Sequence, residues 1–219
     1  MWEDFEKYWP ALRAGAWLTV QITFAAMAVA LVVGLVFALL QLNRRRFYIY
    51  WPVHVIVELL RGTPLLLQIF YIYFVLPEAG VRLSPVVAGI AALGLNYGAY
   101  LSEVYRAGIA AVPRGQIEAA QSLNYSQALT MRRIILPQAI RIVIPPMGNY
   151  FIALFKDTAL LSTISVVELL FATQLIASST FNYFGMYTIV MVLYFLICYP
   201  AALGVKVVER QLSTKLKVR

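Results

Sequence analysis

The chain has 219 residues, of which 62% are hydrophobic and 13% charged, and its mean hydropathy is +0.77. Soluble domains carry about 45 to 50% apolar residues, so this composition indicates an integral membrane protein. The net charge of +8 could point to nucleic acid, but the basic residues are spread among apolar segments without a nucleic-acid-binding motif, which excludes that class. Cys198 and His54 are the only cysteine and histidine, so we expect neither a disulfide framework nor a paired-cysteine metal site.

The first predicted membrane span runs from Ala16 to Leu40. Residues 1–15 precede it as an N-terminal interfacial segment, in which Met1 to Trp9 are amphipathic and should form a short helix that stops near Pro10. Acidic residues in this segment are unlike a cleaved signal, so the span should act as its own insertion signal. Small residues recur at every fourth position and permit close helix contact, unless they merely face lipid: Ala26, Ala30, Gly34 and Ala38.

The second span is irregular. Asn43 to Arg46 precede it as a positive anchor, which predicts a cytoplasmic loop. Glu58 and Arg61 should lie near the start of the span, and Gly62-Thr63-Pro64 interrupts it before the run from Leu65 to Leu76. Because proline removes a backbone donor and glycine loosens a helix, this tripeptide predicts a hinge near the inner membrane surface. The alternative is a plain helix start, with Pro64 in its first turn and Glu58 paired with Arg61.

The third span should run from about Val86 to Tyr105, after a turn-rich loop from Pro77 to Pro85. Gly94 and Gly98 form a close-packing pair within it. Three polar residues follow at steps of four and three: Asn96, Tyr100 and Glu103. This spacing puts them on one helix face, which must contact protein or water rather than lipid. The alternative is that Glu103 simply pairs with Arg106 at the cytoplasmic interface.

A polar region from Glu118 to Pro137 stands between strongly apolar flanks. Pro113 suits the first turn of a helix that should run to about Leu123. Asn124 is suited to the left-handed position after a helix end, and Ser126 can cap a second helix that ends before Pro137. The sequence therefore predicts a bent pair of short helices, although a plain solvated hairpin is the alternative.

The fourth span should start near Arg141 and be broken by a cluster of helix-disrupting residues: Pro145, Pro146, Gly148 and Asn149. It ends at Lys156-Asp157-Thr158, where a simple Lys156 and Asp157 pair in an outer loop is the alternative. Broken segments at membrane depth often mark transport sites. Thr173 to Gly185 should form a loop or surface helix, and Met186 to Val205 the last span, before a basic tail at residues 206–219.

These elements predict an all-α integral membrane protein with about five transmembrane helices in a single domain, residues 1–219. Most basic residues then fall on one side: Arg44, Arg45, Arg46, Arg61, Arg106, Arg114, Arg132, Arg133, Arg141 and the tail. Only Lys7, Arg13, Arg82 and Lys156 fall on the other. The positive-inside rule then predicts an external N-terminus, a cytoplasmic loop at residues 106–137 and a cytoplasmic C-terminus.

Several motifs resemble the permease subunits of ATP-binding-cassette (ABC) importers, in particular the polar amino acid family of histidine, glutamine, glutamate and arginine permeases. They are Glu58 to Leu65 with Gln68; Asn96 to Tyr100 with Glu103 and Arg106 to Ile109; Glu118-Ala119-Ala120 with Leu123, Ile134, Leu136 and Pro137; Phe155 to Leu160; and Ser165 to Leu170. The resemblance covers nearly the whole chain, from the first span to Val205. One position departs, because Asn124 stands where the family usually has glycine.

The resemblance implies a type I importer fold and three groups of functional residues. The polar region from Glu118 to Pro137 would be the family's signature loop, and its first short helix would lie in a cleft of the ATPase. Ala119 and Ala120 would allow close approach there. Ile117 and Leu123 would add apolar contact, and Glu118 a charge-assisted hydrogen bond. The ATPase-coupling residues are Ile117, Glu118, Ala119, Ala120, Leu123, Asn124, Leu136 and Pro137. The gate or hinge comprises Arg61, Gly62, Thr63 and Pro64. The substrate path comprises Asn96, Tyr100, Glu103, Lys156, Asp157, Thr158 and Glu168.

The resemblance also implies partners. The sequence has no Gly-x-x-x-x-Gly-Lys-Ser/Thr motif, so ATP and Mg²⁺ are expected on a separate ATPase, and no cofactor or metal on this chain. A dimer of ATP-binding subunits, a second permease subunit, identical or paralogous, and an external solute-binding protein are expected around a bacterial inner-membrane permease. An ion-driven secondary amino acid transporter and an intramembrane enzyme are the alternatives, although no clear repeat and no convergent nucleophile or metal set supports them. The amino acid carried and the pairing of the permease stay open.

Overall fold

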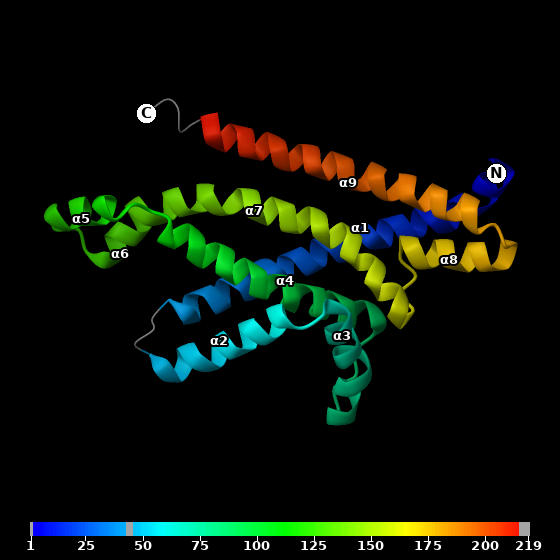
Figure 1. Ribbon diagram of the computed structural model, residues 1–219, viewed down its shortest axis with the longest axis horizontal. Coiled ribbons are helices and arrows are strands. Elements are labelled where there is room, and N and C mark those ends of the chain that lie inside the picture. The colour runs from blue at the N-terminus through cyan, green and yellow to red at the C-terminus, as the bar shows by residue number, and fades with distance from the viewer. Residues whose placement is uncertain (1, 43–45, 215–219) are drawn as a thin grey trace.

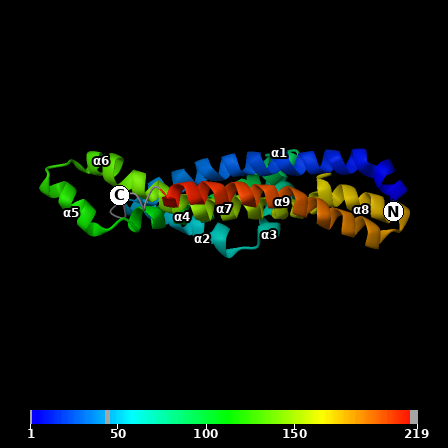
Figure 2. The ribbon, with the colours of Figure 1, turned by 90° about the horizontal axis from the view of Figure 1, so that it is seen from above.

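The computed structural model describes residues 2–42 and 46–214, and the side chains of residues 6–42 and 46–211. Met1, the part of the predicted anchor from Asn43 to Arg45 and the end of the predicted tail from residue 215 lie outside these ranges. All the described elements are helical. The long helices are α1 (Trp2–Gln41), α2 (Phe47–Gly62), α4 (Pro85–Ala110), α7 (Leu136–Asp157) and α9 (Tyr183–Thr214). The molecule is elongated, and α5 (Arg114–Ser122) and α6 (Gln127–Thr130) lie at the opposite end from the N-terminus and α8 (Leu169–Thr180) (Figures 1 and 2).

Within the described ranges, three helices are long and apolar enough to cross a membrane, namely α1, α4 and α9. Two bent pairs raise the count to five if each pair is one span, which matches the predicted number. In the first pair, α2 is followed at an angle of 111° by α3 (Leu65–Phe70), a π-helical turn η1 (Tyr71–Val75) and a 3₁₀ turn η2 (Leu76–Ala79). In the second pair, the helical run from Gln127 to Ile164 meets α8 at 51°. That run comprises α6, the π-turn η3 (Met131–Ile135), α7 and the 3₁₀ helix η4 (Thr158–Ile164).

The α1–α4 contact is the centre of the fold, and small residues on both helices make it possible. Ala26, Ala30 and Ala38 are buried, as the predicted small-residue stripe requires. A side chain at Gly94 would place its Cβ 2.5 Å from Val29 Cγ1, and one at Gly98 would place it 2.9 Å from Val33 Cγ1. The predicted close-packing role of both glycines is therefore confirmed. Leu93, Leu101 and Leu154 extend this core toward α7.

The N-terminal helix does not stop near Pro10, which lies inside α1. The first half of this helix packs on α8, since Leu12 is fully buried in a cluster with Leu169 and Ile176. Gly15 allows the close approach, because a Cβ there would lie 3.0 Å from the Leu169 Cα. This tertiary packing outweighs the local effect of the proline, and the separate short interfacial helix was a wrong prediction.

The predicted break at Pro145, Pro146, Gly148 and Asn149 is also wrong, because α7 runs through all four positions. Gly148 serves a helix contact instead, since a Cβ there would lie 2.3 Å from Val205 Cγ1 of α9. The break comes later, at η4 and at Ser165, whose φ is 62°. Residues 173–180, predicted as loop or surface helix, belong to α8, where Thr173, Ile176 and Ala177 are buried.

The predicted bounds of two shorter segments, near Pro137 and between Pro77 and Pro85, also differ from those in the structure. The helix after Ser126 does not end before Pro137, because η3 leads without a gap into α7, and Pro137 follows this π-helical turn as the second residue of α7. The predicted loop from Pro77 to Pro85 begins within η2 and turns at Gly80, whose φ is 87°. Ser84 then caps α4 by accepting a hydrogen bond from the Val87 amide at 3.4 Å.

Candidate functional site

The joint between α2 and α3 is the first part of the candidate site. Its break lies at Gly62-Thr63-Pro64, as predicted, and the Thr63 backbone is extended there. Because α2 already begins at Phe47, Glu58 and Arg61 lie in its last turns rather than near the start of the span, which corrects that prediction. A proline without an amide hydrogen cannot continue the hydrogen-bond ladder, so the carbonyl of Leu60 loses its usual partner at this joint.

Two buried amide side chains donate hydrogen bonds to the Leu60 carbonyl at this helix end. Gln68 Nε2 donates to the Leu60 carbonyl at 2.7 Å and to Thr63 Oγ1 at 2.8 Å. Asn96 Nδ2, from α4, donates to the same Leu60 carbonyl at 3.0 Å and to Gln68 Oε1 at 3.1 Å. The predicted path residue Asn96 therefore meets the predicted hinge directly.

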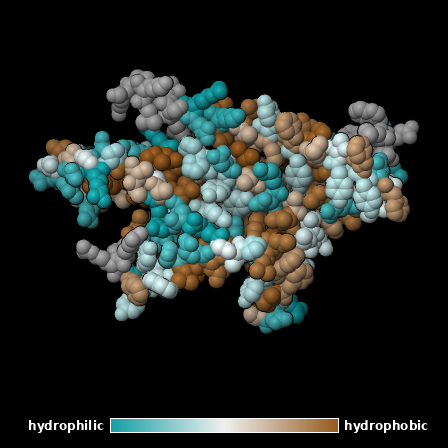
Figure 3. All heavy atoms as spheres, in the orientation of Figure 1, coloured by the Kyte–Doolittle hydropathy of each residue, from teal (hydrophilic) through white to brown (hydrophobic). Residues whose placement is uncertain are grey.

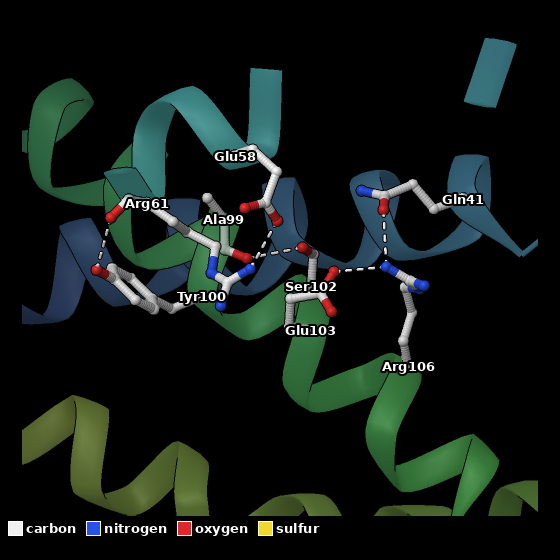
Figure 4. Close-up of polar contacts among 8 residues, drawn as sticks. All are labelled: Gln41, Glu58, Arg61, Ala99, Tyr100, Ser102, Glu103 and Arg106. Atoms are coloured by element: carbon white, nitrogen blue, oxygen red, sulfur yellow. Dashed lines mark hydrogen bonds and ion pairs between the residues drawn. The ribbon is translucent and has the colours of Figure 1, made fainter. Parts of the chain in front are cut away.

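Tyr100 and Arg61 continue the contact one helical turn further along α4 (Figure 4). The Tyr100 hydroxyl donates to the Arg61 carbonyl at 3.2 Å, and the Arg61 guanidinium lies 5.6 Å from the centre of the Tyr100 ring. Arg61 also pairs with Glu58 at 2.9 Å. The structure thus contains both the break of the hinge prediction and the Glu58–Arg61 pair of the alternative.

Glu103 takes part in a second polar group near the end of α1. It forms an ion pair with Arg106, as the alternative for this face predicted. Arg106 also donates to Gln41 Oε1 of α1 at 2.8 Å (Figure 4). Glu103 thus helps to connect α4 to α1, and its negative charge has a cationic partner inside the chain.

A tyrosine cluster joins α4 to the end of α7. Tyr97 donates to Asp157 Oδ2 at 2.6 Å, and Tyr150 packs against both Tyr97 and Tyr100, with ring centres 5.9 and 5.7 Å apart. Thr158 is buried and donates to the Phe155 carbonyl, whereas Lys156 is exposed. Of the three predicted path residues at this end of α7, Asp157 is the one hydrogen-bonded to the polar face of α4.

Glu168 lies apart from these residues, in a fully buried position before α8. Its carboxylate accepts hydrogen bonds from the backbone amides of Leu170 and Phe171, and so caps α8. It also accepts from the Tyr194 hydroxyl of α9 at 2.7 Å and from Thr19 of α1 at 3.5 Å. These contacts tie three helices together, which indicates a structural role for this predicted path residue.

The α5–α6 hairpin, residues 114–130, is a separate part of the candidate site, at the end of the molecule away from the N-terminus (Figure 1). Asn124 is left-handed, with φ 57°, as predicted. The Tyr125 amide donates to the Ala120 carbonyl and the Asn124 amide to the Gln121 carbonyl, which together make a Schellman motif. Ser126 then caps α6 by accepting from the Leu129 amide at 3.3 Å, as predicted. The bent helix pair is therefore built mainly from its own backbone.

The two faces of α5 differ. Ala120 is 3% exposed, and Ile117 packs against the cluster of Val112, Ile135 and Ala139. Glu118, Ala119 and Leu123 point outward, and Leu123 is 70% exposed. The structure thus leaves Ala119 available to a partner, buries Ala120 and half-buries Ile117. Leu136 and Pro137 are exposed where α7 begins.

The space-filling view shows how these parts sit on the surface. In Figure 3, hydrophilic residues gather at the α5–α6 end and over α4, between α2 and α7, whereas the projecting α3 region is mostly hydrophobic above a hydrophilic tip. In the part of the chain that the structure describes, no group of three or more His, Cys, Asp or Glu residues could hold a metal ion. The polar surface over α4 carries hydrogen bonds and ion pairs, among them those of Asn96, Tyr100 and Glu103.

The sequence predictions missed several residues of this arrangement. Gln68 was noted only as part of a motif, Tyr97 and Tyr150 were not assigned a role, and neither was Gln41. A signal for Gln68 was present, because a glutamine in the apolar run from Leu65 to Leu76 needs a partner away from lipid. The tyrosines gave no such signal, since tyrosine is also common at lipid interfaces.

Residues 21–214 match the family described as the binding-protein-dependent transport system inner membrane component. A relative from Sinorhizobium fredii, named a probable amino-acid ABC transporter permease protein, is 43% identical over 206 residues, which cover 94% of this chain and 89% of the relative. The L-cystine transport system permease protein of Bacillus subtilis is 38% identical over 95% of this chain and 89% of its own. A crystal structure of an amino acid ABC transporter with histidines contains a chain that is 36% identical, with a TM-score of 0.90 over 94% of this chain and 96% of that one.

Proposed function

Because this chain belongs to the family of binding-protein-dependent transport system inner membrane components, we propose that it is the permease subunit of an ATP-driven importer for a polar amino acid or related zwitterion. Membership of this family confirms the resemblance seen in the sequence and makes the chain a transport subunit of the inner membrane. It also favours an importer subunit over the ion-driven transporter and the intramembrane enzyme. The substrate class rests on the names of the relatives and of the similar solved structure.

The observation that carries the proposal is the outward face of the α5–α6 hairpin. Glu118, Ala119 and Leu123 are exposed on it, while Ala120 and Ile117 anchor α5 to the start of α7. A helix that is packed on one side and capped by a Schellman motif moves as a unit, so force applied to its outer face reaches α7 directly. The hairpin thus has the form of a lever between a partner and the membrane helices.

The partner on this face would be the ATP-binding subunit, working as a dimer that binds ATP and Mg²⁺. A second permease copy or paralogue would complete the membrane domain, and an external binding protein would deliver the solute. This arrangement requires a bacterial plasma membrane with the hairpin and the C-terminus in the cytoplasm and the N-terminus outside. The distribution of basic residues supports that orientation.

The solute path would follow the polar face of α4 toward the end of α7. Tyr97, Tyr150 and Asp157 line this face together with the joint that carries Arg61. A zwitterion needs both an anionic and a cationic group to meet its two charges, and Asp157 and Arg61 supply that pair of charges. Glu168, buried among α1, α8 and α9, would act from outside the path.

Reconstitution of the complex in proteoliposomes tests the proposal. The permease, its ATPase and the binding protein should take up a labelled polar amino acid when ATP is present on the cytoplasmic side. Glu118→Ala should reduce both uptake and solute-stimulated ATP hydrolysis, because loss of a hydrogen-bonded charge at an interface costs about 2 to 5 kcal/mol. Glu78→Ala, an exposed glutamate on η2, is the matched control and should behave as wild type. Uptake driven by an ion gradient without ATP would refute the proposal.

A further inference from the structure

We infer that Gln68, Asn96 and Tyr100 are positioning residues: they replace the backbone hydrogen bonds missing from the last turn of α2, and thereby hold the α2–α3 joint and its Arg61 against α4. Their importance for transport rests on the proposed function. Their hold on the joint does not, because it follows from contacts within this chain. The two statements can therefore be tested separately.

The argument begins with the carbonyls at the end of α2. In a continuous helix the carbonyl of Leu60 would accept from the amide of residue 64, but residue 64 is a proline and has no amide hydrogen. The carbonyl of Arg61 would accept from the amide of residue 65, which the 111° bend turns out of line. A helix end inside a membrane cannot leave such groups unpaired, since no water is there to satisfy them.

Three of the last carbonyls of α2, those of Leu59, Leu60 and Arg61, have a side-chain donor in place of an amide. The Leu59 carbonyl accepts from Thr63 Oγ1 at 2.8 Å. The Leu60 carbonyl accepts from both Gln68 and Asn96, and the Arg61 carbonyl from the Tyr100 hydroxyl. Donors are thus matched to the carbonyls in order along the helix end, and the carbonyl facing the proline receives two.

The donors are fully engaged within the protein. Both hydrogens of Asn96 Nδ2 are taken, one by the Leu60 carbonyl and one by Gln68 Oε1. Gln68 Nε2 contacts the Leu60 carbonyl and both oxygens of Thr63, while its own Oε1 is occupied by Asn96. A solute could take the N–H donors of these amides only by displacing the joint, so these donors act by placing Arg61 rather than by contacting cargo.

The consequence is a fixed position for one cation. Arg61 is held through its carbonyl by Tyr100, through its guanidinium by the Tyr100 ring and through its charge by Glu58. Its place beside the polar face of α4 therefore depends on the angle of the joint. If the caps are lost, the joint should sample several angles and Arg61 should no longer occupy one position.

Spin labels measure the joint directly. Cysteines at Ile49 on α2 and Val75 on η1, both exposed, are labelled in a Cys198→Ser background of the complete transporter in nanodiscs. We expect one narrow distance distribution for the wild type and a clearly broader one for Gln68→Met and for Asn96→Leu, which keep the length or the branching of the side chain but lose the donors. Tyr100→Phe, which removes a single hydroxyl, should broaden it less and guards against general misfolding. Gln174→Met on α8 is the matched control for the glutamine variant. Tyr71→Phe, at an exposed tyrosine, is the matched control for Tyr100→Phe.

Transport kinetics supply the second readout. If Gln68→Met and Asn96→Leu misplace Arg61 without removing a solute contact, the maximal rate of solute uptake should fall about tenfold. The KM for the solute should then change less than about twofold. A several-fold rise in KM at unchanged rate, with unchanged distance distributions, would mean that Gln68 and Asn96 bind the solute, and the inference would be overturned. If the wild type transports nothing, the proposed function fails, but the distance distributions still decide whether the caps hold the joint.

Pro64→Ala is the sharpest test, because it returns the missing amide. In the Asn96→Leu background this amide can donate to the Leu60 carbonyl if the helix continues through residue 64. We therefore expect the distance distribution to narrow again, around a changed mean, since the helix straightens. A double variant as broad as Asn96→Leu alone would show that the orphan carbonyl is not what Asn96 serves, and would also overturn the inference.

Discussion

The sequence predicts the ends of both α2 and α5, yet the free carbonyls at these two helix ends are hydrogen-bonded in different ways. The end of α5 is closed by its own chain, with the Tyr125 and Asn124 amides on carbonyls five and three residues back. The end of α2 is closed by side chains, two of which come from α4, 36 and 39 residues away. One termination is complete as a local segment, whereas the other exists only in the assembled protein.

This difference matches what each region does in the proposed transporter. A hairpin that must keep its shape while a partner moves it benefits from closure by its own backbone. A joint beside a transport path, in contrast, is connected through Asn96 and Tyr100 to the same face of α4 that carries Tyr97 and its bond to Asp157. Changes in the position of α4 should therefore reach the α2–α3 joint, and leave the end of α5 as it is.

The largest expected effect concerns a helix start that combines both kinds of closure. Glu168 caps α8 locally and also accepts from Tyr194 and Thr19 of distant helices. Glu168→Ala should cost about 2 to 5 kcal/mol, the sum of a lost cap and of buried donors left unpaired. Ser84→Ala is the control, since the Ser84 side chain caps α4 with a local bond. Thermal unfolding of both variants in nanodiscs measures the difference, and equal losses would show that the distant contacts contribute nothing.

A slightly smaller effect is expected from the contact that places α4. Gly94→Leu would force a side chain into Val29, and overpacking of this kind costs about 1 to 3 kcal/mol. The shift of α4 should also broaden the distance distribution across the α2–α3 joint while hydrogen exchange in the α5–α6 hairpin stays the same. Gly204→Leu on α9 is the control, because a Cβ there meets no atom within 4 Å among the residues included in the structure. A change in the hairpin equal to that in the joint would break the comparison.

The same contrast explains which features could be predicted from the sequence. Local residue types were sufficient to predict the left-handed turn at Asn124, the helix cap at Ser126 and the helix break at Pro64. In each case the residue itself favours the backbone conformation, supplies the cap or lacks the amide donor. Local residue types wrongly predicted a helix end at Pro10 and a break at Pro145 and Pro146. There α1 stays continuous where it packs on α8, and α7 where it packs on α9. Local residue types could not show that Gln68 would meet Asn96, since that contact depends on how α2, α3 and α4 fold together.

Asn124 tests the local side of the comparison. Asn124→Val should cost the hairpin about 1 to 2 kcal/mol, because a β-branched residue resists the left-handed conformation at φ 57°. Asn124→Gly should be nearly neutral, since glycine adopts this conformation without strain. Solute-stimulated ATP hydrolysis in proteoliposomes should fall for the valine variant and stay at the wild-type level for glycine. Equal activity of the two variants would show that the shape of this turn does not matter for coupling.

The smallest expected effect comes from Ser126, whose hydroxyl accepts one exposed hydrogen bond from the Leu129 amide. Ser126→Ala should cost about 0.5 to 1 kcal/mol, toward the low end for an N-cap, because water can replace this partner. The loss should speed hydrogen exchange in residues 126–130 and stop there, since η3 and α7 are held by Ile135, Ala139 and Val143 in the interior. The α2–α3 distance distribution should be the same as in the wild type, because the hydrogen bonds of Ser126 join it to Leu129 and Thr130 of the helix that it caps. A broader distribution in this variant would mean that the hairpin and the joint are coupled, and that local closure does not isolate one from the other.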